Sequence, residues 1–199
     1  MKKLFSTLIL MLFCLVSLPV MAAEEDAGMG FWFEARTASG SKPSEIVGYY
    51  ERGFTDTFGV YVVAVADSSR YREVYAGPTW NPTKWLQVGI GFGREITRDM
   101  PNSPRRNAWV AIETDKVSAF ATYENGGSGP WHKAYVLYKV TESVSAGVMN
   151  ETFLGRGLRV EYTIAKKIAF AENVTIWGAL LHDRDTKETT SLLAVNFSF

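Results

Sequence analysis

The chain is poor in the residues that build disulfide frameworks and most metal sites. Its 199 residues include one cysteine, Cys14, and two histidines, His132 and His182. A single cysteine cannot form an internal disulfide, and cysteine-type zinc sites are excluded. Excess charge is also absent, because 21 basic side chains balance 21 acidic ones. Without a basic block to neutralise phosphates, nucleic acid is not an expected partner, and we expect no cofactor and no metal.

Long apolar runs are confined to the amino terminus. Two lysines precede an apolar stretch over 4–20, and small residues around Ala22 form a cleavage signal. This pattern predicts a signal peptide over 1–22, and an uncleaved membrane anchor is the alternative. The remaining domain, 23–199, contains no cysteine and carries a net charge of 19 − 21 = −2. An exported chain of this kind has no disulfide framework.

Aromatic residues are abundant, with 6 Trp, 9 Tyr and 12 Phe, and they occur where apolar and polar side chains alternate. Alternation interrupted by short polar breaks is typical of β-strands joined by hairpins. Twelve segments are predicted: 29–37, 44–52, 57–67, 70–80, 84–95, 105–114, 117–124, 131–140, 144–151, 157–164, 168–181 and 188–199. In the eleventh segment Glu172 interrupts the alternation, which indicates a bulge or a later start of that strand. A barrel of ten strands is the alternative.

The breaks between these segments alternate in length. The longer set is richer in charge, glycine and proline, and includes residues 38–43, 96–104 and 182–187. The shorter set includes residues 115–116 and 141–143. A transmembrane antiparallel up-and-down β-barrel has this asymmetry, with short periplasmic turns and longer outer loops. The sequence therefore predicts an all-β fold of this type with both chain ends in the periplasm.

The alternation defines two faces for each strand. In the last segment Leu193, Val195 and Phe197 alternate with small or polar residues. A water-soluble barrel, with the apolar face inward, would show the same alternation. Aromatic residues beside the breaks, such as Trp80 and Trp85, are typical of the girdles at a membrane interface. We therefore predict that the apolar face meets lipid.

The carboxy-terminal sequence SLLAVNFSF, residues 191–199, ends in Phe199. It resembles the targeting strand of Gram-negative outer-membrane β-barrel proteins. The resemblance implies an outer-membrane location in a Gram-negative bacterium, insertion by the barrel-assembly machinery and a targeting role for Phe199. A twelve-stranded barrel with short loops also resembles small oligosaccharide porins, but the inward basic tracks that this likeness implies are absent. The family stays unassigned, and we expect a monomer.

With the apolar face outward, charged side chains point into the barrel, eight of them acidic and four basic. A water-filled lumen of this kind favours cations. We predict a narrow porin-like channel for small hydrophilic solutes, whose lumen residues are Glu73, Glu95, Glu113, Lys133 and Arg159. Two alternatives remain: pairing of these charges for stability alone, and a lumen plugged by its inward aromatic side chains. The inward aromatic residues are Trp85, Trp109, Tyr135 and Trp177.

Three glycines, Gly89, Gly91 and Gly93, occupy successive inward positions of one predicted strand. Glycine in a strand commonly marks the close approach of a neighbour. A turn at 81–83 would place Tyr75, Glu73 and Tyr71 opposite Gly89, Gly91 and Gly93, in that order. We therefore interpret the glycines as packing sites.

Arginines cluster at the outer ends of neighbouring predicted strands. Forked guanidinium groups suit the phosphates of lipopolysaccharide. This rim supports the second functional hypothesis, a non-conducting structural or surface-interaction barrel that contacts lipopolysaccharide or partner proteins. A solvated loop is the alternative for the rim, whose predicted members are Arg70, Arg72, Arg94, Arg98, Arg105 and Arg106.

Enzymatic activity is not expected. A hydrolytic site would need His182 and its neighbouring aspartates to meet Glu124, and nothing in the sequence fixes those distances. No serine lies two residues after His132, so the His-x-Ser pair of the lipid A deacylases is missing.

Overall fold

The computed structural model describes residues 29–100, 102–168 and 171–199, and the predicted signal peptide, 1–22, lies outside them. No helix in this described part is long and apolar enough to cross a membrane. The predicted all-β fold and the twelve strands are confirmed. The strands are β1 (Met29–Ala38), β2 (Glu45–Gly53), β3 (Phe58–Asp67), β4 (Arg72–Thr83), β5 (Leu86–Ile96), β6 (Ser103–Glu113), β7 (Val117–Gly126), β8 (Gly129–Lys139), β9 (Val144–Glu151), β10 (Gly155–Ile168), β11 (Ala171–His182) and β12 (Thr189–Ser198).

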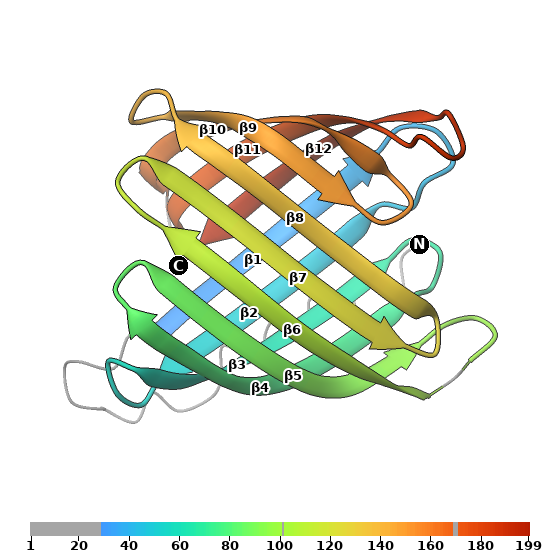
Figure 1. Ribbon diagram of the computed structural model, residues 1–199, viewed down its shortest axis with the longest axis horizontal. Helices are drawn as coiled ribbons and strands as arrows, with labels where there is room; N and C mark the ends of the chain where they lie inside the picture. The colour runs from blue at the N-terminus through green and yellow to red at the C-terminus, as the bar shows by residue number, and fades with distance from the viewer. Residues whose placement is uncertain (1–28, 101, 169–170) are drawn as a thin grey trace.

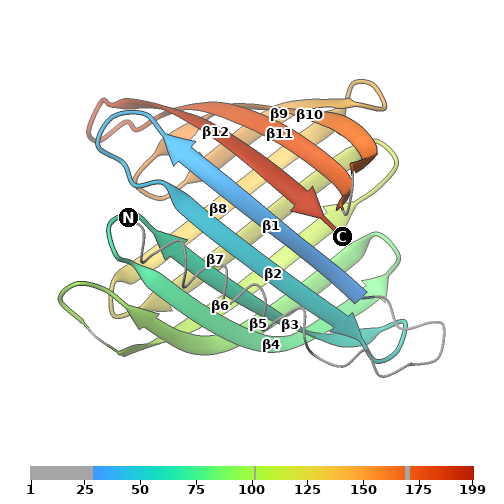
Figure 2. The same cartoon turned by 180° about the vertical axis from the view of Figure 1, so that it is seen from behind.

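The twelve strands form one closed antiparallel barrel in which each strand pairs with its sequence neighbours. Figure 1 shows the tilt of the strands around the barrel. The barrel closes where β1 pairs with β12, with Phe33 opposite Phe197, and Figure 2 shows β1 between β12 and β2. Closure leaves no edge strand, which a membrane requires of a sheet.

Two hairpins differ from the sequence-based prediction. In the β4–β5 hairpin Tyr75 pairs with Gly93 and not with Gly89, its predicted partner, and the register shifts between Trp80 and Thr83. β4 runs on to Thr83, so the turn lies later than the predicted 81–83, and the predicted partners of all three glycines are wrong.

The second difference concerns the eleventh strand. β11 begins at Ala171, so the later start is confirmed. The irregularity itself lies on the partner strand β10, between Thr163 and Ala165.

Large apolar side chains cover the outside of the barrel. Leu158, Phe92 and Ile90 are 68%, 64% and 52% exposed. A water-soluble barrel would have these side chains inside, whereas a transmembrane barrel presents them to lipid. The predicted face assignment is therefore confirmed.

Side chains fill the middle of the barrel. One buried cluster gathers around Trp177 and Leu181, and a second around Tyr61 and Trp109. Stacked, tilted and edge-to-face ring contacts line the inner wall and join, in this order, Trp32, Tyr49, Tyr61, Trp109, Phe120 and Tyr135.

Candidate functional site

We call the end of the barrel that carries the longer loops the outer end, following the prediction from loop length. The first candidate site is a charge network inside this outer half of the barrel. Arg105, on β6, is 3% exposed and forms ion pairs with Glu73, Glu95 and Glu124 at 2.5, 2.8 and 2.8 Å. Glu95 also accepts hydrogen bonds from the backbone N–H and the hydroxyl of Ser128, in the β7–β8 turn. The network therefore ties a turn at the barrel mouth to the lumen wall.

A second network crosses the lumen from β1. The Arg36 guanidinium lies 2.6 Å from Glu151, on β9, and 3.0 Å from Glu45. The Arg159 guanidinium packs between two rings, 4.2 Å from the Tyr135 centroid and 4.0 Å from the Trp177 centroid. Such contacts hold the two walls of the barrel together.

The five predicted lumen residues do not form one continuous track. Glu73 and Glu95 belong to the Arg105 network, and Lys133 lies 3.7 Å from Glu34. Arg159 pairs with Glu161. Glu113 lies at the inner mouth of the barrel, where its side chain is 61% exposed and forms an ion pair with Lys139 at 2.5 Å. All five residues therefore form ion pairs in the structure, and their role in the lumen stays a prediction.

The glycines on β5 make room for rings, as predicted. A Cβ atom on Gly89 would lie 2.5 Å from the Trp109 indole, and one on Gly91 would lie 2.4 Å from the Tyr61 hydroxyl. Trp109, Tyr135 and Trp177 point inward as predicted, but Trp85 does not. It is 49% exposed beside the β4–β5 turn, because β4 is longer than predicted.

A cavity of about 410 Å³ opens at the inner end of the barrel. Its polar lining includes Glu51, Asn81 and Gln87. Towards the middle of the barrel, buried Tyr61 and Thr79 are 0% and 1% exposed. Among the described residues no group of acidic, histidine or cysteine side chains could hold a metal ion.

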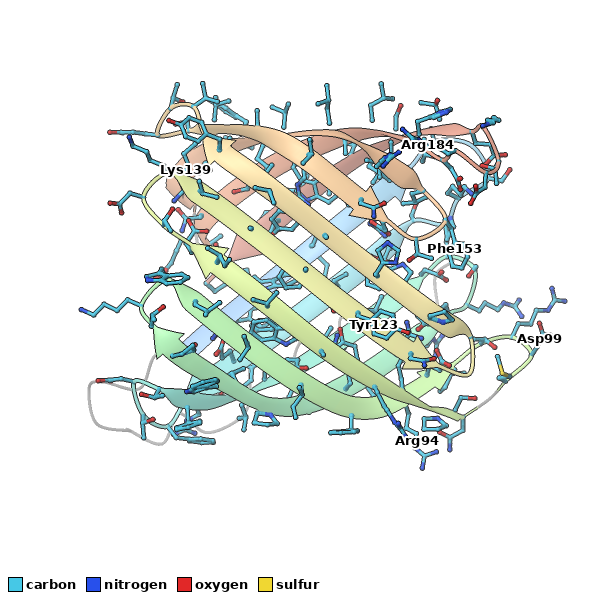
Figure 3. All side chains as sticks on the ribbon, viewed as in Figure 1. Arg94, Asp99, Tyr123, Lys139, Phe153 and Arg184 are labelled. Carbon is cyan, nitrogen blue, oxygen red and sulfur yellow. The ribbon has the colours of Figure 1, made fainter. Side chains whose placement is uncertain are left out.

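The outer end of the barrel carries exposed arginines on three adjacent strands. Arg72, Arg94 and Arg106 lie on β4, β5 and β6 with their side chains exposed. Arg94 pairs with Val74 and Pro104, which are two residues along their strands from Arg72 and Arg106. Such diagonal neighbours are about 7–8 Å apart. Figure 3 shows Arg94 and Asp99 at the end opposite Lys139.

These three residues form what we call the arginine patch. None of their guanidinium groups has an ion-pair or hydrogen-bond partner among the residues that the structure describes. Of the predicted rim, Arg70 and Arg98 lie in exposed outer loops. Arg105 corrects the prediction, because strand alternation turns it into the lumen while Arg106 faces outward. Arg94, also in the predicted rim, lies on the strand between those of Arg72 and Arg106 and completes this patch.

A hydroxyl–imidazole pair also lies on the outer rim. The Thr152 Oγ1 atom, just after β9, is 2.8 Å from His132 Nδ1 on β8, and Asn150 Nδ2 is 3.2 Å from His132 Nε2. No local sequence pattern predicts this group, because its members meet only through the pairing of β8 with β9. His182 makes a looser pair, with Nδ1 3.1 Å from Thr189 Oγ1, and Glu124 lies in the lumen away from it.

Comparison with known proteins places the chain among outer-membrane β-barrels. No protein family model matches the sequence. The chain is similar to the lipid A acyltransferase PagP of Legionella pneumophila, with 31% identity over 91 residues, which is 42% of this chain and 49% of that protein. The match thus spans about half the length of that relative.

Solved structures share the fold. The KdgM porin superposes with a TM-score of 0.56 at 15% identity, covering 85% of this chain and 99% of that one. LpxR from Salmonella typhimurium superposes with a TM-score of 0.50 at 10% identity, covering 85% and 99%. The chain is an outer-membrane β-barrel of unassigned family.

One expectation is overturned by these comparisons. The prediction that the chain is not an enzyme is wrong, because the relative found by sequence is an acyltransferase. The prediction relied on the missing His-x-Ser pair. The fold brings the Thr152 hydroxyl, from the turn after β9, next to His132 on β8, and a motif within one strand does not reveal this contact.

Proposed function

We propose that this outer-membrane β-barrel binds the phosphorylated head group of lipopolysaccharide at its outer rim, through the arginine patch. The observation that carries the proposal is a contrast within the chain. The buried arginines Arg36 and Arg105 are both ion-paired, whereas Arg72, Arg94 and Arg106 are exposed and unpaired. Unpaired arginine at head-group depth suits bidentate phosphate recognition.

The position of the patch supports the same partner. The outer face beside the patch is apolar: Val74 is cross-strand from Arg94, Phe92 is cross-strand from Arg106, and the two are 49% and 64% exposed. Guanidinium groups at the edge of an apolar band lie where lipid phosphates begin. The likeness to a lipid A acyltransferase supports a lipid partner as well.

Binding of purified lipopolysaccharide by the full chain in detergent tests this proposal. We expect Arg72→Gln, Arg94→Gln and Arg106→Gln together to weaken binding at least tenfold, because three phosphate contacts are lost. Binding by the unaltered chain should also weaken as salt is added. The control carries Arg52→Gln, Lys84→Gln and Lys116→Gln, which remove three exposed charges from the opposite end. Equal losses in both variants would point to net charge and contradict a specific patch.

A narrow channel for small hydrophilic solutes is the second candidate. The polar cavity at the inner mouth favours it, and the fold is shared with porins. Its lumen would be mildly acidic, with Glu51 at the cavity and Glu73 deeper inside. Passage requires movement of the rings that fill the middle of the barrel.

The orientation belongs to the same proposal. After removal of residues 1–22, both chain ends face the periplasm and the arginine patch faces outward. The Phe199 ring packs at a tilt against Phe31, with ring centroids 5.2 Å apart, at the β1–β12 closure. In this position it would be presented to the assembly machinery before closure. A monomer suffices for the site, because the patch lies within three strands of one barrel.

A further inference from the structure

We propose that Thr152, His132 and Asn150 form an acyl-transfer site that cleaves an ester of an outer-leaflet lipid. The inference goes beyond head-group binding, and it rests on the proposed function in one respect: the lipid held by the arginine patch is the substrate. The geometry is that of a nucleophile, a base and a group that orients the base. Thr152 Oγ1 lies 2.8 Å from His132 Nδ1, and Asn150 lies 3.2 Å from His132 Nε2.

The hydroxyl is held in place by the backbone. The His132 N–H donates to Thr152 Oγ1 at 2.8 Å, and the Thr152 N–H donates to the His132 carbonyl at 2.9 Å. The following turn is anchored on both sides, because Leu154 is buried in the core and Lys42 donates to the Phe153 carbonyl at 3.4 Å. Phe153 has a φ of 67°, a left-handed conformation that a non-glycine residue keeps only when its surroundings impose it.

The group faces the membrane side of the rim. His132 and Asn150 are exposed, and Phe153 beside them is 68% exposed. Tyr123 on β7 lies between this group and the arginine patch. It pairs with His132 on β8 and with Ala108 on β6, and Arg106 is two residues from Ala108. Figure 3 shows Tyr123 and Phe153 at the same end of the barrel as Arg94. A lipid whose phosphate contacts the arginine patch therefore has its ester groups within reach of the hydroxyl.

The reaction needs no cofactor. His132 Nδ1 accepts the Thr152 hydroxyl proton while Oγ1 attacks the ester carbonyl carbon. The bond to the lipid alcohol breaks, and the proton on Nδ1 passes to the leaving oxygen. Water then attacks the acyl-Thr152 ester, releasing a fatty acid and restoring the hydroxyl. Arg156 lies beside the site with an exposed guanidinium, opposite Asn150, where it can stabilise the oxyanion.

Histidine must hold its proton on Nε2 to act in this way. Asn150 then turns its amide oxygen towards the ring and accepts the Nε2–H, which leaves Nδ1 free for the hydroxyl. Asn150 is thus a positioning residue. Asn150→Ala is expected to lower kcat with little change in KM, since it does not touch the substrate.

The test uses the full chain in detergent micelles with two probes. p-Nitrophenyl palmitate has no phosphate and reports the chemistry alone, whereas lipopolysaccharide reports chemistry and head-group binding together. We expect cleavage of both probes, with Thr152→Val and His132→Gln lowering the rates about 100-fold or more. Thr152→Ser should retain most activity and carry a covalent acyl group detectable by mass spectrometry.

The second imidazole–hydroxyl pair supplies a matched control. His182 and Thr189 lie on the same rim at 3.1 Å, without an amide partner for the ring among the described residues, so His182→Gln and Thr189→Val should leave both rates unchanged. An unaltered, folded barrel that cleaves neither probe overturns the inference, as does full activity of Thr152→Val. Failure of lipopolysaccharide binding with intact palmitate cleavage would contradict only the proposed function.

Discussion

At the scale of single residues, the most consequential side chain is Arg105. Its guanidinium group forms ion pairs with three carboxylates, and one of them, Glu95, is 0% exposed. A buried charge is tolerated only when it is paired, and removing one partner leaves the others uncompensated. Arg105 therefore stabilises the outer half of the barrel and does not serve the rim.

Arg105→Met is expected to lower the free energy of unfolding by about 3–5 kcal/mol, because three buried carboxylates lose their counter-charge. Urea unfolding in lipid vesicles measures the change. Arg106→Met, on the opposite face of the same strand, is the control and should cost less than about 1 kcal/mol. A loss in Arg105→Met no larger than that of the control would contradict the network.

The same pair of residues shows what the sequence could reveal. Alternation within a strand puts Arg105 and Arg106 on opposite faces. The pattern alone therefore indicates that Arg105 and Arg106 cannot both belong to the outer rim. The contact of His132 with Thr152 is not indicated by the pattern, because it depends on the register between two strands and on a left-handed residue in the turn.

At the scale of elements, β5 is shaped by its glycines. Gly89 and Gly91 lack side chains where Trp109 and Tyr61 enter from β6 and β3. Periodicity in the sequence predicted that these glycines pack against large side chains. It predicted the wrong partners, because the β4–β5 turn lies later than predicted and the register of the hairpin shifts between Trp80 and Thr83.

Gly89→Ala should destabilise the barrel by about 1–3 kcal/mol, because the new Cβ would lie 2.5 Å from the Trp109 indole. Unfolding in vesicles provides the measurement. Adding Trp109→Phe should restore much of the loss, since the smaller ring leaves space for the methyl group. That exchange also removes an indole N–H that has no hydrogen-bond partner in the described part of the chain. If Trp109→Phe gives no recovery, the clash is not the cause.

At the scale of the whole molecule, the barrel divides its charges between two environments. Inside, Arg36, Arg105 and Arg159 are paired with carboxylates, and aromatic rings fill the space between them. Outside, the cations of the arginine patch have no partner in the described chain. The alternation of apolar and polar residues and the number of strand-length segments predicted this architecture, because they determine which face of each strand meets lipid and how many strands the barrel has. They could not predict whether the lumen is filled, which depends on how side chains from opposite walls meet.

Planar-bilayer recordings test whether the filled lumen conducts. We expect no discrete current steps from the folded, unaltered chain, because Tyr61 and Trp109 are 0% and 9% exposed in the middle of the barrel. Tyr61→Ala with Trp109→Ala should produce steps by removing two rings. The control, Tyr138→Ala with Tyr162→Ala, removes two rings from the lipid-facing side, where exposure is 53% and 51%, and should stay silent.

The opposite result has a clear physical meaning. Cation-biased steps from the unaltered chain would show that the rings move aside and would favour the channel over a closed barrel. Glu73→Gln should then reduce the cation bias, because this carboxylate lies within the lumen beside Arg105. An unchanged reversal potential in that variant would place the conducting path away from the Arg105 network, towards the wall that carries Arg159.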